Sequence, residues 1–354
     1  IDDLIVGAGY GDPNSLTDAG ESYVVFGTTA GFSATIELAA LNGSNGFKIN
    51  GLEAGKHAGI SVSNAGDVNG DGYDDVLIGT YRGEGSYSGG NEAYVLFGGP
   101  SVGASGSVNL STLAGTDGFI VGDFSSGTRG SFVSSAGDVN GDGFDDLLVS
   151  DSKADPGGNG DAGETYVIFG GDFSNVVTHL GTSAADQLTG TTSRNIMVGG
   201  QSNDTLAGAG GADTLLGGGG NDILGISDTT FQRIDGGPNA SSGADTLRLD
   251  GNGMALNLTT INDSKIQGIE KIDATGSGNN TITLKLSDVL NISDSTNTLL
   301  IVGDPGDSVS INTGSTSLTT TTDVVVDNVT YTQYTASGTD LILLVEQEMS
   351  KTVI

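Results

Sequence analysis

The sequence predicts an all-β protein, in which partial β-propeller blades precede a parallel β-roll and a C-terminal β-rich domain. Three observations support this fold class. A unit of 71 residues containing short strand-like runs recurs through the first half, a nonapeptide rich in Gly and Asp repeats in the middle, and alternating apolar runs fill the rest. We place the three parts at residues 1–172, 173–225 and 226–354.

The composition favours a protein that binds cations. Acidic residues outnumber basic ones 44 to 12, which gives a net charge of −32 and disfavours binding to nucleic acid or to anionic membranes. The chain has 61 Gly residues, and most of its acidic residues are Asp placed singly or in pairs beside Gly and Asn, a pattern typical of cation ligation in tight turns. Without Cys there are no disulfides, and no apolar run approaches the ~20 residues that cross a bilayer.

The first half contains one repeated unit. The segment GISVSNAGDVNGDGYDDVLIGT (59–80) recurs as GSFVSSAGDVNGDGFDDLLVSD (130–151), and the strand-like YVVFG at Tyr23 recurs at Tyr94 and Tyr166. Several short strands per repeat, bounded by turn residues, predict β-propeller blades. The first unit begins inside a blade, at the tail of its aspartate loop. We therefore expect further blades upstream, or neighbouring chains that complete the array.

Each complete unit contains a loop of the form DVNGDG(Y/F)DD with oxygen ligands at positions 1, 3, 5, 7 and 9. Calcium takes six to eight hard oxygens, and glycines at positions 4 and 6 allow the sharp reversal that directs alternate side chains to one centre. An EF-hand is excluded because its twelfth-position Glu is missing. We expect Asp74 and Asp145 to lie outside the coordination shell or to face solvent. The predicted ligands, with backbone carbonyls from the aromatic residues, are Asp67, Asn69, Asp71, Tyr73 and Asp75, and Asp138, Asn140, Asp142, Phe144 and Asp146.

The pattern GDVNGDGxDD followed by (Y/V)VxFG resembles the FG-GAP repeat of integrin α-subunit propellers and their bacterial relatives. The resemblance covers roughly residues 1–172. It implies that each calcium loop links two strands of one blade. The first blade keeps only Asp2 and Asp3 of its loop.

A second repeat begins at Gly181 and continues to residue 225 with a period of nine. Asp or Asn recurs every ninth residue from Asp186, and a large apolar residue follows two positions later. This Gly-Gly-x-Gly-x-Asp-x-U-x pattern predicts a parallel β-roll, with turns that ligate Ca²⁺ and one apolar side chain per repeat in a narrow core. A core of five such side chains is too thin to fold without metal. We expect several ions, at Asp204, Asp213 and Asp222, and expect the first two repeats to act as a cap.

These nonapeptides resemble the RTX repeats of bacterial proteins exported by type I secretion. The resemblance implies a module that is unfolded in low cytosolic calcium and folded outside the cell.

Residues 226–354 contain alternating runs such as NTITLKLS and resemble C-terminal segments of large RTX adhesins. The final LILLVEQEMSKTVI is either part of an uncleaved secretion signal or a terminal strand with a frayed tail.

The sequence contains no constellation of catalytic residues, and we predict that the chain is not an enzyme. It has no Cys nucleophile and no zinc-protease motif, and we interpret its two histidines, His57 and His179, as surface residues.

Three functional hypotheses follow. The first is a secreted, calcium-folded adhesion or structural protein of a surface layer, extracellular matrix or fibre, which associates with itself or with cell-surface components. The second is the non-catalytic half of a larger secreted enzyme. The third is a propeller that binds carbohydrate or another ligand. We favour the first.

Overall fold

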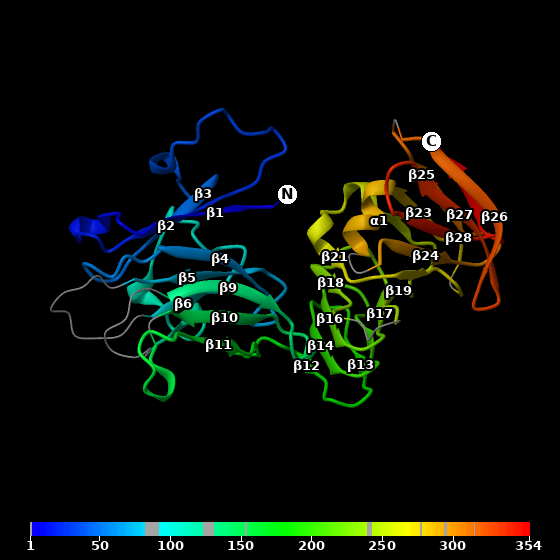
Figure 1. Ribbon diagram of the computed structural model, residues 1–354. Helices are drawn as coiled ribbons and strands as arrows, with labels where there is room; N and C mark the ends of the chain where they lie inside the picture. The colour runs from blue at the N-terminus through cyan, green and yellow to red at the C-terminus, as the bar shows by residue number, and fades with distance from the viewer. Residues whose placement is uncertain are drawn as a thin grey trace. The chain divides into compact units, whose positions relative to one another are not determined.

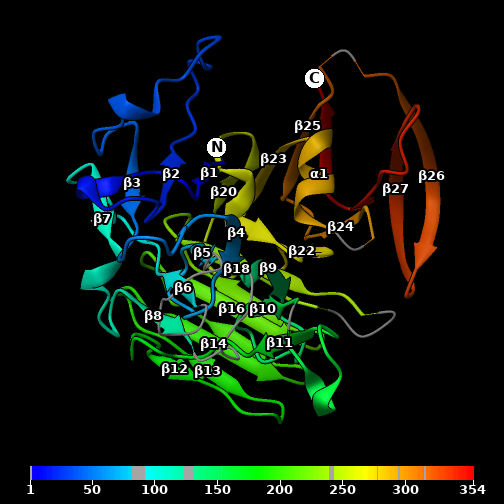
Figure 2. The ribbon, with the colours of Figure 1, turned by 60° about the vertical axis from the view of Figure 1, so that its left-hand side comes forward.

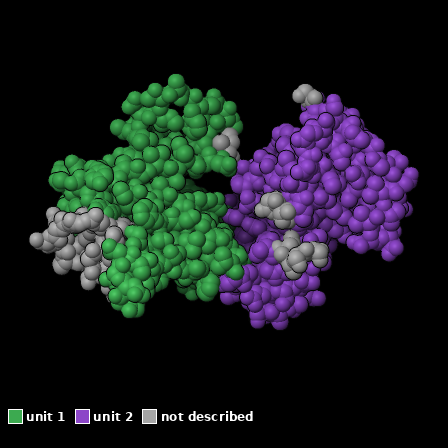
Figure 3. All heavy atoms as spheres, viewed as in Figure 1, with its two compact units in different colours: residues 1–139, 144–175 green, residues 140–143, 176–354 purple. Residues whose placement is uncertain are grey.

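The computed structural model describes residues 2–81, 92–122, 131–152, 154–238, 243–276, 278–293, 296–314 and 316–354. They form two compact units (Figure 3). Unit 1 comprises residues 1–139 and 144–175, and unit 2 comprises residues 140–143 and 176–354. Nearly all regular structure is β, so the predicted fold class is confirmed.

Unit 1 consists of three small sheets that correspond to the repeated unit of the sequence (Figure 1). In each sheet three consecutive strands pair antiparallel. The first sheet adds a fourth strand in parallel pairing, and the second adds a fourth strand in antiparallel pairing. This order is that of a propeller blade. The strands are β1 (Leu4–Ala8), β2 (Glu21–Val25), β3 (Gly46–Asn50) and β7 (Ser107–Asn109) in the first sheet, β4 (Ser61–Gly66), β5 (Asp75–Gly79), β6 (Ala93–Leu96) and β8 (Gly118–Val121) in the second, and β9 (Ser131–Gly137), β10 (Asp146–Asp151) and β11 (Glu164–Ile168) in the third.

The apolar residues of these strands make the core between the sheets. Leu77, Val95 and Leu147 are fully buried, because successive side chains of a strand point to opposite faces and each sheet packs against the next. The first and second sheets meet around Ile49 and Ile78. Short 3-10 turns complete the connections of both units, at Pro13–Ser15, Leu38–Ala40, Leu110–Thr112, Pro156–Gly158, Leu258–Thr260 and Asp263–Lys265.

Unit 2 is a parallel roll whose strands alternate between two sheets (Figure 2). Each coil of 18 residues is two nonapeptides, so Leu188 pairs in register with Leu206 and Leu206 with Leu224. Met197 and Leu215 pair in the same way on the facing sheet. One sheet contains β12 (His179–Leu180), β14 (Ile196–Gln201), β16 (Thr214–Gly219), β18 (Arg233–Asp235) and β21 (Ile266–Gln267), and the other begins with β13 (Gln187–Thr189), β15 (Thr205–Ala207), β17 (Ile223–Ile226), β19 (Thr246–Leu249) and β22 (Lys271–Asp273).

The parallel pairing continues past residue 225 without interruption. β17 pairs with β19, and the second sheet extends through β24 (Thr298–Val302) and β28 (Ile342–Glu346) to a long hairpin. A third sheet joins it, and the short helix α1 (Leu286–Ile292) lies beside the later coils (Figure 1). The hairpin is β26 (Leu318–Val326) and β27 (Val329–Ala336), and the third sheet is β20 (Ala255–Asn257), β23 (Thr281–Lys285), β25 (Ser308–Asn312) and β29 (Ser350–Val353).

Besides a small cluster of Val302, Tyr331 and Leu344, unit 2 contains a large apolar core. It begins at Met197 and includes Leu206, Leu215 and Leu224, which confirms that the periodic apolar residues point inward. It then continues without a break to Met349. The five-residue core expected from the nonapeptides alone is therefore wrong, because later coils add strands to the same sheets. The predicted boundary at residue 225 falls inside this unit, within β17.

Candidate calcium sites

The two aspartate loops lie where the strand pattern places them, each between two neighbouring antiparallel strands of one blade. Residues 67–74 join β4 to β5, and residues 138–145 join β9 to β10. The glycines of both loops have positive φ: 74° at Gly70, 88° at Gly72, 72° at Gly141 and 86° at Gly143. These values favour glycine and produce the same reversal in both copies.

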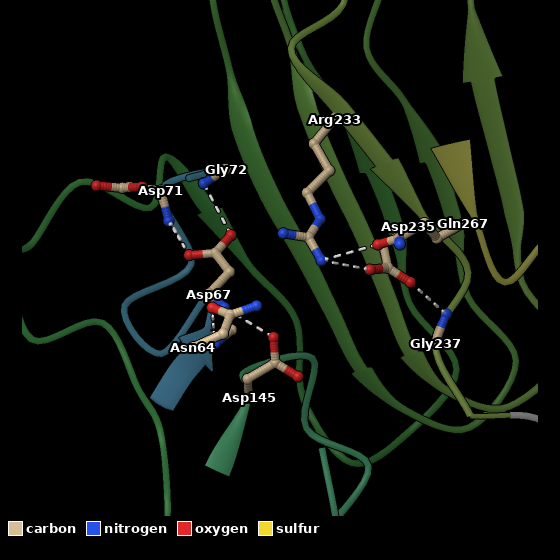
Figure 4. Close-up of polar contacts among 10 residues, drawn as sticks. Asn64, Asp67, Asp71, Gly72, Asp145, Arg233, Asp235, Gly237 and Gln267 are labelled. Carbon is tan, nitrogen blue, oxygen red and sulfur yellow. Dashed lines mark hydrogen bonds and ion pairs between the residues drawn. The ribbon is translucent and has the colours of Figure 1, made fainter. Parts of the chain in front are cut away.

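In the first loop, predicted ligands accept hydrogen bonds from backbone amides of the same loop. Asp67 accepts the Asp71 amide at 2.9 Å through Oδ1 and the Gly72 amide at 2.8 Å through Oδ2 (Figure 4). Asn69 Oδ1 also accepts the Asp71 amide, at 3.0 Å. A carboxylate oxygen has two lone pairs, so an oxygen that accepts a hydrogen bond from one backbone amide can also bind a cation.

The ninth-position aspartates have a structural role that the sequence analysis missed. Asp75 Oδ2 accepts the Val68 amide at 3.0 Å, and its Oδ1 accepts the Gly98 amide at 2.8 Å, at the end of β6. The same bond recurs between Asp146 and Gly170, at 2.9 Å, and between Asp3 and Gly27, at 2.8 Å. The sequence signal for this contact is an Asp followed 23 or 24 residues later by a Gly, which occurs in all three copies of the 71-residue repeat.

The electrostatics of the first loop favour a bound cation. Burial, together with the negative charges of Asp67 and Asp71, raises the pKa of Asp75 well above its ordinary value. Like-charged carboxylates in a buried loop are relieved by a divalent cation. Within the described ranges no three His, Asp or Glu side chains lie together as a metal-binding group. Calcium at the two loops therefore stays a prediction.

A bond between the two loops joins neighbouring blades. Asp145 Oδ2 accepts the Asp67 amide at 2.7 Å, and the Asp145 amide donates to the Asp67 carbonyl at 3.2 Å (Figure 4). The side chain of Asp145 is partly buried, whereas Asp74, at the same position of the preceding loop, is exposed as expected. Asp145 thus fixes the first ligand position of the other loop.

We predict that Asp145→Ala destabilises unit 1 by about 1–3 kcal/mol, because it leaves the buried Asp67 amide without its acceptor. Asp74→Ala is the matched control and should change the free energy of unfolding by less than about 0.5 kcal/mol. Urea denaturation in calcium measures both values. Equal effects of the two variants would show that the contact between the loops is unimportant.

The nonapeptide turns contain a ladder of carboxylate-to-amide bonds between coils. Each acidic side chain accepts the amide of the residue in the corresponding position one coil earlier, at distances between 2.6 and 3.0 Å. In this carboxylate ladder each side chain uses one oxygen for the bond between coils, so its second oxygen remains for contacts within its own turn. The bonds run from the amides of Asp186, Asn195, Asp204, Asp222 and Asp245 to the side chains of Asp204, Asp213, Asp222, Asp245 and Glu270, respectively.

The side-chain oxygen that is not used in the bond between coils distinguishes the two capping repeats from the candidate calcium sites. In the first repeat Asp186 Oδ2 accepts the Thr182 amide and hydroxyl, at 2.7 and 2.8 Å, and in the second Asn195 Oδ1 accepts the Thr191 amide at 2.7 Å. Asp204 Oδ2 and Asp222 Oδ2 are buried and have no hydrogen-bond donor. A buried carboxylate oxygen without a partner is costly, and a cation would satisfy it.

Space and a second oxygen are present beside both orphaned atoms. A Cβ atom at Gly199 would lie 2.7 Å from Asp204 Oδ2 and 2.5 Å from the Gly217 carbonyl oxygen. At Gly217 it would lie 2.5 Å from both Asp222 Oδ2 and the Gly236 carbonyl oxygen. The first glycine of each repeat therefore keeps room between a carboxylate and a carbonyl, the hard oxygens that calcium prefers. The residues present fit a bound calcium ion.

Burial raises the pKa of Asp222 to about 7, and it also raises the pKa values of Asp204 and Asp213. Asp213 is buried too, and besides burial the charge of Asp228 raises its pKa while Arg194 lowers it. Asp245 and Glu270 extend the ladder beyond the period-nine region. The period of nine did not reveal Glu270, because insertions lengthen these coils.

The comparisons with known proteins agree with this geometry. The model of the RTX calcium-binding nonapeptide repeat matches residues 180–215 and 189–224, and that of the FG-GAP repeat matches residues 58–96 and 130–168. The chain carries RTX repeats and FG-GAP repeats. The RTX roll is accordingly a calcium-binding element. No curated protein matches the sequence.

RTX repeats usually occur in secreted proteins. Among the described residues, no helix has the length and apolar character needed to cross a membrane.

The prediction that His57 is a surface residue is wrong. His57 is 8% exposed, its Nδ1 lies 3.1 Å from the Gly9 carbonyl oxygen, and its ring packs between Tyr10 and Tyr81. A positive φ of 47° turns the side chain into this aromatic contact. His179 is partly exposed, beside the Thr178 hydroxyl at 2.9 Å.

Proposed function

We propose that the chain is a secreted structural or adhesion element, which several calcium ions fold and assemble into a surface layer, matrix or fibre. The observation that carries this proposal is the pair of orphaned oxygens, Asp204 Oδ2 and Asp222 Oδ2, in the turns of the RTX roll. Calcium would complete these turns only where its concentration is high, outside the cell. The net charge of −32 adds self-repulsion that bound calcium reduces.

We also propose that the chain has no catalytic activity. Its buried acidic side chains are engaged with backbone amides in the loops and in the carboxylate ladder. His57 is held between two tyrosines. Partners are then calcium and either further copies of the chain or components of the cell surface.

The test is a calcium titration of the chelated protein, followed by far-UV circular dichroism and light scattering on one sample. We expect β-structure to increase with calcium and scattering to rise after it, whereas Mg²⁺ at equal concentration should do neither, because its octahedral shell is harder to complete from these turns. β-structure without scattering would replace the assembly by a monomeric binding module. No change in either signal would contradict the proposal.

A further inference from the structure

The second aspartate loop contacts the first at the backbone of its first ligand position. Asp145, at position eight of the second loop, accepts the Asp67 amide at 2.7 Å through Oδ2, and its own amide donates to the Asp67 carbonyl oxygen at 3.2 Å. A Cβ atom at Gly66 would overlap Asp145 Oδ2, and Gly66 has φ of 74°, so glycine is required for this close approach. The carboxylate of Asp67 in turn accepts the amides of Asp71 and Gly72. Asp145 therefore fixes the residue on which the fold of the first loop depends.

The preceding residue of the second loop packs against a turn glycine of the first. Phe144 is buried, and its carbonyl oxygen is a predicted calcium ligand. A Cβ atom at Gly70 would lie 2.5 Å from Cε1 of the Phe144 ring and 3.0 Å from its Cδ1. Gly70 is one of the two glycines that reverse the first loop. Because the two residues are in close contact, a change in the backbone path of the first loop requires Phe144 to move as well.

Two consecutive amides after β11 connect the loops a third time. The Gly170 amide donates to Asp146 Oδ1 at 2.9 Å, and Asp146 is the predicted ninth-position ligand of the second loop. The Gly171 amide donates to the carbonyl oxygen of Val68 in the first loop, also at 2.9 Å. A Cβ atom at Gly170 would lie 2.5 Å from the Asp145 carbonyl oxygen and 2.9 Å from that of Val68. Adjacent backbone groups thus hold both loops in one closely packed contact.

We propose that the two aspartate loops bind calcium with positive cooperativity, through Asp145, Phe144 and the amides of residues 170 and 171. The proposal rests on the prediction that each loop binds calcium. Binding orders a loop, and this ordering has an entropic cost. An ion in the second loop fixes Phe144 and Asp146, so the contacts between the loops already hold the backbone of the first loop for its own ion. The coupling is reciprocal, and such couplings typically change affinity by about 5- to 150-fold.

Electrostatics opposes this coupling, because an ion in one loop reduces the attraction of the other loop for a second cation. Salt screens that effect, so the affinities are to be compared at about 0.15 M ionic strength. The residues that make the contacts are shielded from solvent, since Asp67, Phe144 and Asp146 are all buried. We therefore expect the contacts to determine the sign of the coupling.

Terbium luminescence reports the first loop by itself. Tb³⁺ takes the hard oxygen ligands that Ca²⁺ prefers, and a tyrosine beside the ion sensitises its emission. Tyr73 stands at position seven of the first loop, whereas the second loop has Phe144 there. The emission that Tyr73→Phe removes therefore belongs to the first loop. Displacement of this emission by calcium, measured on the full chain, gives the calcium affinity of the first loop.

Asp142→Ala removes a predicted ligand from the second loop and should weaken calcium binding in the first loop by about fivefold or more. Asp142 itself bonds to Asn140 of its own loop. In an Asp145→Ala background most of this effect should disappear, whereas a purely structural role of Asp145 would leave it unchanged. Asp145→Asn keeps an oxygen for the Asp67 amide and should retain the effect. Asp74→Ala, at the same position of the first loop, is the matched control and should retain it too.

The possible failures can be told apart. If no emission depends on Tyr73, the first loop binds no cation, and the proposal falls together with its premise. Emission that depends on Tyr73, with an equal or tighter calcium affinity in Asp142→Ala, would overturn the cooperativity alone. Circular dichroism in calcium checks that the variants keep the β-structure of the parent. Asp142→Asn, which removes the same charge with less change in shape, provides the comparison if Asp142→Ala does not keep it.

Discussion

Gly217→Ala should raise the calcium concentration at the midpoint of RTX-roll folding by about fivefold or more. The new methyl group would lie 2.5 Å from both Asp222 Oδ2 and the Gly236 carbonyl oxygen, so it would occupy the space between two candidate calcium ligands. Relieving that overlap costs about 1–3 kcal/mol, and 1.4 kcal/mol corresponds to a factor of ten. A calcium titration followed by far-UV circular dichroism measures the shift.

The matched control is Gly115→Ala. Gly115 has no atom within 4 Å of the added Cβ and no positive φ, so the midpoint should stay within about twofold of the parent. A Gly217→Ala protein that folds at the same calcium concentration as the parent would show that this space holds no cation.

Asp222→Asn should stabilise the folded roll in the absence of calcium but weaken the binding of calcium. The Asp222 side chain is fully buried, and burial raises its pKa to about 7, so its charge destabilises the calcium-free roll at neutral pH. The substitution removes this charge but keeps an oxygen for the Asp204 amide. Asn195 already occupies the corresponding position three repeats earlier, and its backbone amide still donates to Asp213. Without calcium the variant should therefore gain on the order of 2 kcal/mol after screening by solvent is allowed for.

The pH dependence follows from the same shift. The folded-state pKa of Asp222 lies above the ordinary value of 3.8, so between these pH values the folded roll holds the proton more tightly than the unfolded chain. This contribution to stability is complete below pH about 4 and is lost as the pH rises to about 7. In chelator, acidification from pH 8 to 5 should increase β-structure more in the parent than in Asp222→Asn.

Calcium should reverse the order of stability of the parent and the Asp222→Asn variant. Calcium needs the ionised carboxylate, so the parent should bind it less tightly as the pH falls below about 7, and Asp222→Asn should bind it weakly at all pH values. The calcium midpoints at pH 6 and pH 8 measure this difference. Parent and variant midpoints that agree at both pH values would exclude Asp222 as a ligand.

Periodic residues made much of the fold predictable. The apolar residues spaced by nine gave the inward face of the roll, and Met197, Leu206, Leu215 and Leu224 are fully buried there. The 71-residue repeat placed both aspartate loops between neighbouring strands, because each copy carries the same turn glycines and the same flanking apolar runs. A repeated sequence pattern therefore indicates a repeated local backbone geometry.

Features that depend on neighbouring coils or blades were not predictable. The roll continues past residue 225 because Asp245 and Glu270 extend the ladder, but coils of unequal length hide the period. Asp145 bonds to the Asp67 amide of the adjacent loop, a contact that depends on the neighbouring blade and that no local sequence pattern shows. Likewise, only the structure shows that threonine donors satisfy Asp186 while Asp222 Oδ2 has none.

We place calcium beside the orphaned oxygens of the RTX roll. Anomalous diffraction at long wavelength, from crystals of the full chain grown in calcium, locates such ions. We predict anomalous peaks ~2.3–2.6 Å from Asp204 Oδ2 and from Asp222 Oδ2, the calcium–oxygen distance in proteins. Well-ordered turns in which both oxygens bond to water or protein donors, without an anomalous peak, would contradict the account.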